Sequence, residues 1–288
     1  MTTPIDFIER LKCEVCGSFE HDILISKLFT DGAVFDFIKN YYQGRVPESF
    51  LENKKFEVRK CKKCGFVWQG YVLNDAGMGE LYNKWISEEE SLKKKQKWGT
   101  SPHEENALEI GKFFQKPKKN IKVLDFGMGW GFWCVAAKKE GFEVYGFEIS
   151  PTRIDYAKKM GINVINWDEI SQNGPYDFIN TDQVFEHIVN PLETINFLTK
   201  NLKNNGIIKV AVPNGMSVAQ DLSKSNWRAS KNYIQPLEHI NCFAFQALKF
   251  LGVTCGLSVV WPKTIKSIFK FWLSKYSSKM SLVMYFKK

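Results

Sequence analysis

The sequence lacks any apolar stretch near the roughly 20 residues that a membrane-spanning helix requires. The opening segment, MTTPIDFIERLK, also lacks the apolar core of a signal peptide, because charged residues stand in its place. We therefore expect a cytoplasmic protein with no transmembrane segment and no export signal. A chain of 288 residues is long enough for one large domain and one small domain.

Acidic residues are absent from the last part of the chain. Residues 239–288 contain eight lysines and no acid, so they carry most of the formal net charge of +9. The first 238 residues carry only about +1, which leaves no basic stripe that could follow a nucleic-acid backbone. We therefore expect no DNA partner, and an RNA partner is disfavoured for the same reason.

The basic C-terminal segment PKTIKSIFKFWLSKY has the spacing of an amphipathic helix. An ordinary surface helix packed on a sheet explains this pattern. The alternative is a basic helix that makes weak contact with an anionic membrane surface or a phosphate-rich substrate. The expected apolar face consists of Ile265, Ile268, Phe269, Trp272 and Leu273, and the expected basic face of Lys263, Lys266 and Lys270.

Residues 121–149 have the pattern of a strand, a glycine turn, a helix and a second strand that ends in an acid. Gly127, Gly129 and Gly131 let the backbone turn sharply and approach a ligand. The dinucleotide pattern G-x-G-x-x-G/A requires a small residue where Phe132 stands. The missing third glycine therefore disfavours NAD and FAD as the ligand.

Two carboxylates flank this turn. Asp125, at the end of the first strand, would attract a cationic or amino-bearing ligand and repel a pyrophosphate. Glu148, at the end of the second strand, can accept hydrogen bonds from both hydroxyls of a ribose. S-adenosylmethionine has a sulfonium, an amino group and a ribose. The segment Val123–Gly131 resembles the first motif, V-L-D-x-G-x-G-x-G, of the class I S-adenosylmethionine-dependent methyltransferases.

This resemblance covers roughly residues 104–288 and implies a Rossmann-like, mostly parallel seven-stranded α/β sheet with helices on both faces. The alternation of expected strands and helices agrees with a parallel sheet. We expect strands at 121–126, 163–166, 176–182, 206–212, 257–261 and 281–286, and helices at 153–160, 192–202 and 243–251. The resemblance places the cofactor on Asp125, Gly127, Gly129, Trp130, Gly131, Glu148, Asp168 and Asp182, with Asp168 at the adenine amino group.

Two C-x-x-C pairs, Cys13 with Cys16 and Cys61 with Cys64, precede this domain. Such pairs are typical of a tetrahedral four-thiolate zinc site, which would be structural because no coordination position stays open. Disulfides are the alternative, but nothing in the sequence marks an oxidising compartment. We predict a zinc-binding domain at residues 1–80, a helical linker over the cofactor at 81–103 and the methyltransferase domain at 104–288. Cys134, Cys242 and Cys255 are expected to be buried packing residues.

Histidine is scarce, with four in the chain. His187 and His239 each follow a glutamate and are expected at the carboxyl end of the sheet, where α/β folds bind ligands. Each can act as a neutral base or can order a loop by bonding to the backbone. His21 and His103 have no comparable context. Tyr82, in the segment before the first strand, is a candidate for substrate contact.

The motif for methylation of exocyclic base amines, Asn or Asp followed by Pro-Pro-Tyr or Pro-Pro-Phe, is also missing. The chain has F-E-H-I-x-N-P at residues 185–191 and E-H-I-N at 238–241. With the cysteine pairs, these segments resemble the sugar C-methyltransferases of bacterial surface-polysaccharide pathways. The resemblance implies a nucleotide-linked sugar substrate, acid-base roles for His187, Glu238 and His239, and substrate contact by Tyr82. Those enzymes continue into a further C-terminal domain, whereas the expected seventh strand is the last element here. This departure leaves open whether oxygen or carbon receives the methyl group.

The loop at residues 214–235 is long enough to be a lid. Lys224, Arg228 and Lys231 are candidates for a nucleotide diphosphate, and Trp227 and Tyr233 for stacking on a base or sugar; solvated loop charges are the alternative. Other functions left open are an RNA methyltransferase with a zinc ribbon, a small-molecule O-methyltransferase and a non-catalytic binding protein.

Overall fold

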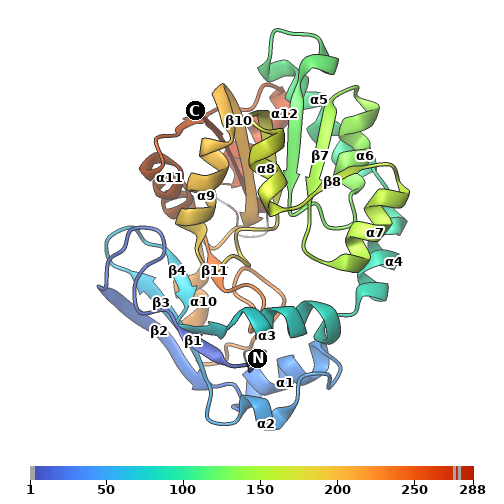
Figure 1. The fold of residues 1–288 in the computed structure, drawn as a ribbon. Coiled ribbons are helices and arrows are strands. Elements are labelled where there is room, and N and C mark those ends of the chain that lie inside the picture. The colour runs from blue at the N-terminus through green and yellow to red at the C-terminus, as the bar shows by residue number, and fades with distance from the viewer. Residues whose placement is uncertain (1–3, 275–276, 278–279) are drawn as a thin grey trace.

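The computed structural model describes residues 4–274, 277 and 280–288. Figure 1 shows a large open sheet flanked by helices, with a smaller body drawn in blue and cyan below it. The predicted α/β fold with a mostly parallel sheet is confirmed. Across these described ranges, no helix is long and apolar enough to cross a membrane.

The large sheet has seven strands in the order β12-β13-β10-β9-β6-β7-β8. Pairing is parallel from β10 through β8, whereas β13 runs antiparallel to both β10 and β12. The predicted closing antiparallel pair is thus present. The strands are β6 (Lys122–Phe126), β7 (Glu143–Phe147), β8 (Asn163–Ile165), β9 (Tyr176–Asp182), β10 (Leu202–Pro213), β12 (Ser258–Val260) and β13 (Ser281–Lys287).

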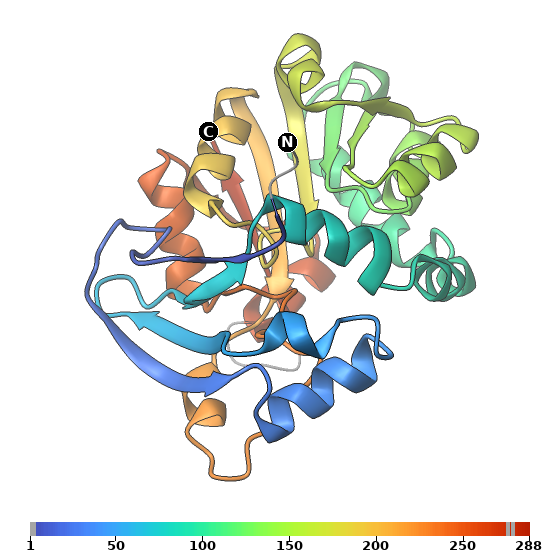
Figure 2. The same ribbon diagram turned by 60° about the horizontal axis from the view of Figure 1, so that its bottom comes forward.

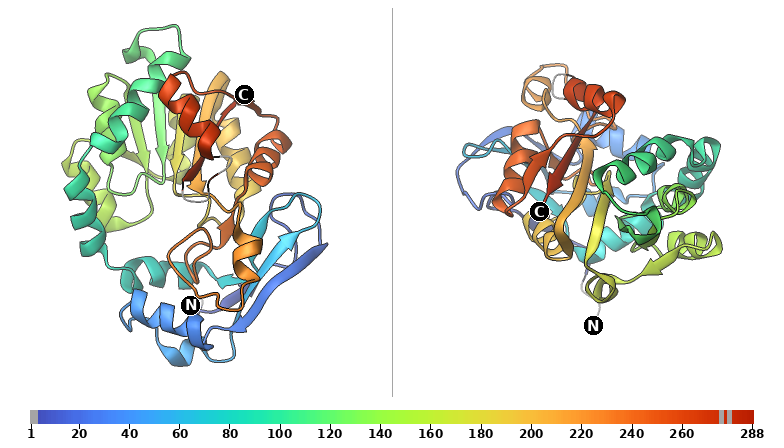
Figure 3. Two further views of the ribbon diagram at one scale, coloured as in Figure 1. Left: turned by 180° about the vertical axis from the view of Figure 1, so that it is seen from behind. Right: turned by 90° about the horizontal axis from the view of Figure 1, so that it is seen from above.

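Helices cover both faces of this sheet, and central strands such as β6 and β9 are accordingly buried on both sides. Apolar residues of α8, α9 and α11 share one core, and those of α5, α6 and α7 share another. Figure 1 shows α8 and α9 in front, and the left panel of Figure 3 shows α12 on the opposite side. The helices are α5 (Ser101–Ile110), α6 (Phe132–Lys139), α7 (Pro151–Lys159), α8 (Trp167–Asn173), α9 (Pro191–Lys200), α11 (Phe245–Thr254) and α12 (Ile265–Ser274).

The basic helix α12 presents a different face from the predicted one. Phe271 is its buried aromatic residue at 3% exposure, whereas Phe269 and Trp272 are 59% and 49% exposed. The predicted apolar face is therefore wrong in its orientation, because buried Glu109 of α5 fixes the start of the helix. Its carboxylate accepts hydrogen bonds from the backbone N–H groups of Lys263 (2.8 Å) and Thr264 (3.2 Å). The predicted helix ends at Lys275 and Tyr276, which lie outside the described residues, as do the side chains of Ile265 and Lys270.

The smaller body has a four-stranded sheet in the order β11-β4-β3-β2 and a two-stranded sheet of β1 and β5. Its core is aromatic and aliphatic, with Phe29, Ile38 and Phe56 fully or almost fully buried. The elements are β1 (Phe7–Glu9), β2 (His21–Leu28), α1 (Gly32–Tyr41), α2 (Glu48–Leu51), β3 (Lys55–Cys61), β4 (Val67–Gln69), β5 (Tyr71–Leu73) and β11 (Asn241–Cys242).

Strand β11 comes from the loop after β10, far from the other strands in sequence. It pairs antiparallel with β4, matching Asn241 with Trp68 and Cys242 with Val67. Helix α10 (Val218–Leu222) of the same loop packs into the core of the smaller body, as Figure 2 also shows. The predicted boundaries at residues 80 and 104 do not account for this loop, because β11 and α10 pack with the N-terminal sheet although they follow the strands of the large one in sequence.

This placement also accounts for the side chains predicted to form a lid. The Trp227 ring stacks on Phe56 at a centroid distance of 6.0 Å, and Lys224 forms an ion pair with Asp221. The Lys231 ammonium donates a hydrogen bond to the Tyr41 hydroxyl. These residues pack on the smaller body and do not line the large cavity described below, nor do Arg228 and Tyr233.

A helical segment joins the two bodies. It consists of α3 (Asp75–Glu80), a π-helical turn at Leu81–Trp85 and α4 (Glu88–Trp98). Helix α4 buries none of its residues, as expected for its acidic and basic blocks. The π-helical turn contains Tyr82, and such turns are frequent at functional sites.

Buried hydrogen bonds fasten the smaller body to the loop after β9. The amide nitrogen of Asn241 donates to the carbonyl oxygens of Phe185 (2.8 Å) and Ile188 (2.5 Å). The guanidinium of Arg10 donates to the carbonyl oxygens of Val189 (2.8 Å) and Ile240 (3.3 Å). Three of these carbonyl groups, those of Phe185, Ile188 and Val189, lie outside any strand or helix, so the donors set the path of residues 185–190.

Replacing Asn241 with alanine should lower the free energy of unfolding by about 1–3 kcal/mol, because buried carbonyl groups lose their donor. Urea denaturation of the whole chain measures this change. Asn40→Ala on the exposed side of α1 is the matched control and should stay within about 0.5 kcal/mol of the parent. Equal stability of the two variants would contradict the role given to Asn241.

Candidate active site

A cavity of about 940 Å³ lies at the carboxyl ends of β6, β7 and β9. Ligand pockets typically measure about 300–1,000 Å³, so this cavity can hold a nucleotide-sized cofactor together with a small second molecule. Its lining comes from the glycine turn, the acid after β7, the loop after β9 and the helical segment that joins the two bodies. The site therefore forms where the two bodies meet.

The glycine turn requires glycine for two different reasons. Gly127, Gly129 and Gly131 have φ angles of +76°, +55° and +78°, which favour residues without a side chain. A Cβ atom on Gly127 would also lie 2.6 Å from a methyl group of Val184, and one on Gly131 would lie 3.2 Å from the Cβ of Ala157. The turn thus leads directly into α6 and keeps its backbone open to the cavity.

Glu148 is held in place by backbone donors. Its Oε2 accepts a hydrogen bond from the N–H of Gly129 (2.9 Å), and its Oε1 accepts from the N–H groups of Ile149 (2.8 Å) and Ser150 (3.0 Å). The carboxylate lines the cavity, and Oε2, which accepts one of these three bonds, has a second lone pair. It can therefore accept a hydrogen bond from a ribose hydroxyl without changing its position.

Asp125 begins a buried polar chain beneath the cavity. Its Oδ1 accepts from the Asn180 amide (2.7 Å), whose Oδ1 accepts from the Lys209 ammonium (3.2 Å). Lys209 also lies 3.4 Å from Asp182, which lines the cavity. Burial raises the pKa of Asp125 to about 7, so its charge depends on a nearby cation.

Aromatic rings form the wall at the expected adenine position. Trp167 and Phe147 both line the cavity, with ring centroids 5.6 Å apart. Asp168, predicted to meet the adenine amino group, is exposed on α8 and is not among the residues that line the cavity, whereas the adjacent Trp167 is. Its contact with adenine stays a prediction. The aromatic walls and the carboxylates of Glu148 and Asp125 together fit S-adenosylmethionine.

Tyr82 and His187 also line the cavity. Their ring centroids are 6.3 Å apart in an edge-to-face arrangement. Burial lowers the pKa of His187 well below its usual range, so the ring is neutral near pH 7. Burial also raises the pKa of Tyr82, which keeps its hydroxyl protonated. This pair can place a hydrogen-bond donor and a neutral base beside a bound molecule.

Glu238 and His239 lie behind His187 and do not line the cavity. The Glu238 carboxylate accepts from the Tyr42 hydroxyl (2.9 Å) and the Gln235 amide (2.8 Å), so it holds the loop together. The His239 ring lies 4.9 Å from that of His187, and burial lowers its pKa to about 4. The acid-base roles implied for Glu238 and His239 therefore stay predictions, and neither side chain is among the residues that line the cavity.

Other residues of the cavity lining were missed by the sequence analysis. His103 on α5 lines the cavity, and burial lowers its pKa. Ser91 of α4 accepts a hydrogen bond from the indole of Trp130 (3.1 Å), which connects the joining segment to the glycine turn. Neither His103 nor Ser91 lies in a recognisable sequence motif. Only the expectation that residues 81–103 fold over the cofactor pointed towards this region.

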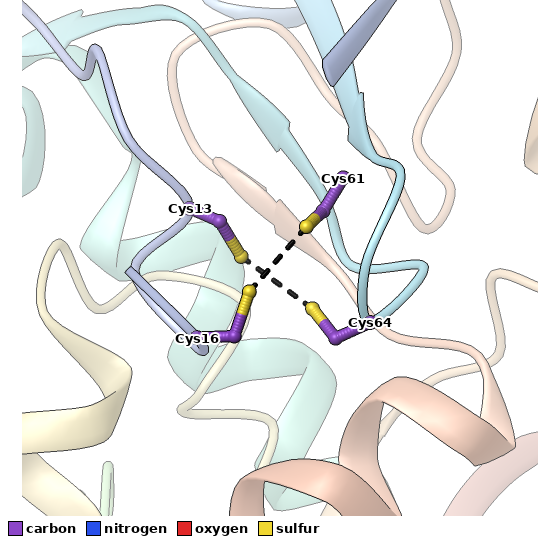
Figure 4. Close-up of side chains that lie close together, drawn as sticks. All are labelled: Cys13, Cys16, Cys61 and Cys64. Atoms are coloured by element: carbon purple, nitrogen blue, oxygen red, sulfur yellow. Dashed lines mark hydrogen bonds between the residues drawn. The ribbon is translucent and has the colours of Figure 1, made fainter. Parts of the chain in front are cut away.

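The four cysteines of the two C-x-x-C pairs converge on one point, as Figure 4 shows. The sulfur atoms of Cys13 and Cys64 are 3.5 Å apart, those of Cys16 and Cys61 are 3.4 Å apart, and all four lie within 4.8 Å of one another. Zn–S bonds of about 2.3 Å in a tetrahedron separate sulfurs by about 3.8 Å. All four cysteines are free thiols, so their geometry fits a metal ion and not disulfides.

Comparison with known proteins identifies the large body. Residues 101–260 match the family model described as a methyltransferase domain. The chain is 30% identical over 108 residues to the ubiquinone biosynthesis O-methyltransferase of Rickettsia canadensis, covering 34% of this chain and 45% of that protein. The corresponding enzyme of Caulobacter vibrioides is 26% identical over 133 residues, covering 43% of this chain and 53% of that protein. The chain thus spans about half the length of these curated relatives.

Among solved structures, the magnesium protoporphyrin IX methyltransferase of Synechocystis PCC 6803 with bound S-adenosylhomocysteine is similar to this chain. The match has 16% identity and a TM-score of 0.45, and it covers 66% of this chain and 83% of that one.

The affinity for S-adenosylmethionine, divided by that for S-adenosylhomocysteine, should rise as pH increases from 6 to 8. Asp125 ionises over this range, and its charge attracts the sulfonium that only S-adenosylmethionine carries. We expect an increase of up to about tenfold per pH unit below the pKa. Calorimetric titration with both ligands measures the ratio.

Asp125→Asn should make this affinity ratio independent of pH, whereas the control Asp155→Asn, on the exposed side of α7, should keep the pH dependence. A parent protein with the same ratio at pH 6 and pH 8 would contradict the role of Asp125.

Proposed function

The chain belongs to the methyltransferase-domain family, and we propose that it transfers a methyl group from S-adenosylmethionine to a hydroxyl-bearing small molecule. Residues 101–260 form an S-adenosylmethionine-dependent methyltransferase domain. One observation carries the proposal. A single cavity brings the glycine turn and its two acids together with Tyr82 and His187.

Each group has a defined task in this proposal. S-adenosylmethionine supplies an electrophilic methyl group when it is bound. Glu148 and Asp125 hold the cofactor at its ribose and its cationic end. Tyr82 orients the acceptor hydroxyl, and neutral His187 is positioned to take its proton. Positioning supplies most of the rate in such a transfer, and a general base adds about 10²- to 10⁴-fold.

We propose a nucleotide-linked sugar as the acceptor. The sequence resemblance of the segments at 185–191 and 238–241 supports this choice. The cavity lining near His187 also includes Asn190, Glu193 and Thr194, whose side chains suit a molecule with several hydroxyls. A different small-molecule O-methylation is the second candidate, favoured by the relatives named ubiquinone biosynthesis O-methyltransferase.

Four weaker expectations remain predictions. No feature of the described cavity lining favours RNA as the methyl acceptor, and none favours a non-catalytic binding role. A cytoplasmic location is an expectation from the sequence alone. Contact of α12 with an anionic membrane surface is a proposal supported by the exposure of Phe269 and Trp272 near Lys266.

We also propose that Cys13, Cys16, Cys61 and Cys64 hold a structural zinc ion. The convergence of their sulfur atoms supports this assignment. Four thiolates complete a tetrahedral coordination shell, so no position stays open for water or substrate. The ion would join the turn after β1 to the end of β3. Its task would be to hold the smaller body in the shape that the cavity requires.

Incubation with S-adenosylmethionine labelled in its methyl group tests the proposed reaction. The panel contains nucleotide sugars, phenolic small molecules and RNA. We expect label on a nucleotide sugar and a fall in kcat of about 10²- to 10⁴-fold in His187→Gln. His21→Gln, on β2 of the smaller body, is the matched control and should behave like the parent.

Binding of S-adenosylhomocysteine should be the same in both histidine variants, since neither residue is assigned to the cofactor. Label on the phenolic compounds alone would contradict a nucleotide-linked sugar as the acceptor and would support the second candidate, a different small-molecule O-methylation. Label on RNA alone, or on none of the panel, would contradict the small-molecule proposal.

A further inference from the structure

Behind the cavity wall, three ligating side chains meet in a cluster that the zinc site does not include. Glu186, His187 and His239 each offer one ligand atom, and these atoms lie within 4.8 Å of one another. Glu186 is 1% exposed, and neither of its carboxylate oxygens has a hydrogen-bond partner among the described residues. A buried carboxylate without a donor is costly unless a positive charge or a proton compensates it.

The two imidazoles are oriented by the backbone. The Nδ1 of His187 is bonded to the carbonyl oxygen of Glu238 (3.0 Å), and the Nδ1 of His239 to that of Asn232. A carbonyl oxygen only accepts hydrogen bonds, so each Nδ1 carries the proton and each Nε2 has a free lone pair. The remaining nitrogens are therefore acceptors, like the carboxylate beside them.

Three hydrogen-bond acceptors that face one another, with no donor for the carboxylate among the described residues, can instead bind a cation. We propose that Glu186, His187 and His239 bind one divalent transition-metal ion at the edge of the cavity. Two imidazoles and one carboxylate form a ligand set that such ions use with coordination positions left open. Imidazoles that ligate metals usually donate their other N–H to a carbonyl or carboxylate, as both histidines do here.

The backbone around the cluster is held firmly enough to support an ion. The N–H of Asn241 donates to the carbonyl oxygen of Glu186 (3.0 Å), and the N–H of His187 donates to that of Val184 (2.9 Å). The cluster thus joins the loop after β9 to the loop before β11. Prior positioning of ligands is what a metal site needs for high affinity.

The role of the ion rests on the proposed function, although its binding does not. His187 belongs both to the cluster and to the cavity lining, so the ion would lie next to the acceptor. Coordination lowers the pKa of a hydroxyl group, which would then lose its proton to water without a protein base. With the ion bound, the Nε2 of His187 is a ligand, and the ion replaces His187 as the group that promotes loss of the hydroxyl proton. The loss of activity in His187→Gln then follows from loss of the ion.

Titration of the zinc-loaded protein with Co²⁺ tests the site. Thiolates hold zinc tightly, so added Co²⁺ reports on a second site, and its ligand-field absorption differs from sulfur-to-cobalt charge transfer. We expect one further Co²⁺ per chain with absorption typical of nitrogen and oxygen ligands. Glu186→Gln and His239→Gln should each weaken binding by more than about 10-fold. The control Glu193→Gln, an exposed acid of the cavity lining, should bind like the parent.

Zinc content and binding of S-adenosylhomocysteine, measured in every variant, establish that each one is folded. Absence of stoichiometric Co²⁺ binding in the folded parent overturns the proposal and leaves a shared proton as the charge that compensates Glu186. Unchanged Co²⁺ binding in both Glu186→Gln and His239→Gln overturns it as well. Co²⁺ binding requires no methyl acceptor, so a failure of the acceptor panel and a failure of the metal site are separate results.

Discussion

The pairing of β11 with β4, with the buried hydrogen bonds of Asn241, is the interaction on which the rest of the site depends. Through this pairing, Asn241 and Cys242 of the loop after β10 form an edge strand of the N-terminal sheet. The same side chain satisfies carbonyl groups of the loop after β9. The two bodies therefore cannot separate without releasing the loop that carries His187.

The residues proposed to hold the cofactor depend less on the pairing of β11 with β4. The glycine turn, Glu148 and the chain from Asp125 to Lys209 all belong to the large body. The residues proposed to contact the acceptor do depend on it. Tyr82 comes from the segment that joins the two bodies, and the Nδ1 of His187 is bonded to the backbone carbonyl of Glu238. The smaller body thus shapes the place where an acceptor would bind, which gives the proposed zinc site a physical role ahead of this fold.

The sequence predicted the parts whose information is local. Strand β9 has the predicted bounds, and the glycine turn and the converging cysteines follow from short motifs. It did not predict β11, because a two-residue strand has no pattern of its own and its partner lies far away in the chain. Glu186-His187 and Glu238-His239 look alike in sequence. Only tertiary contacts place His187 in the cavity lining and leave Glu238 as a buried acceptor. The orientation of α12 likewise depends on Glu109, which lies in another helix.

The most direct test of this account is amide hydrogen exchange before and after a chelator removes the metal from the cysteine cluster. The account predicts that the amides of Asn241 and His187, which donate to Glu186 and Val184, lose protection together with the N-terminal sheet. The amides of β6 and β7 should keep theirs. Unchanged protection of Asn241 and His187 after metal removal would contradict the claim that the zinc-held body positions the active site.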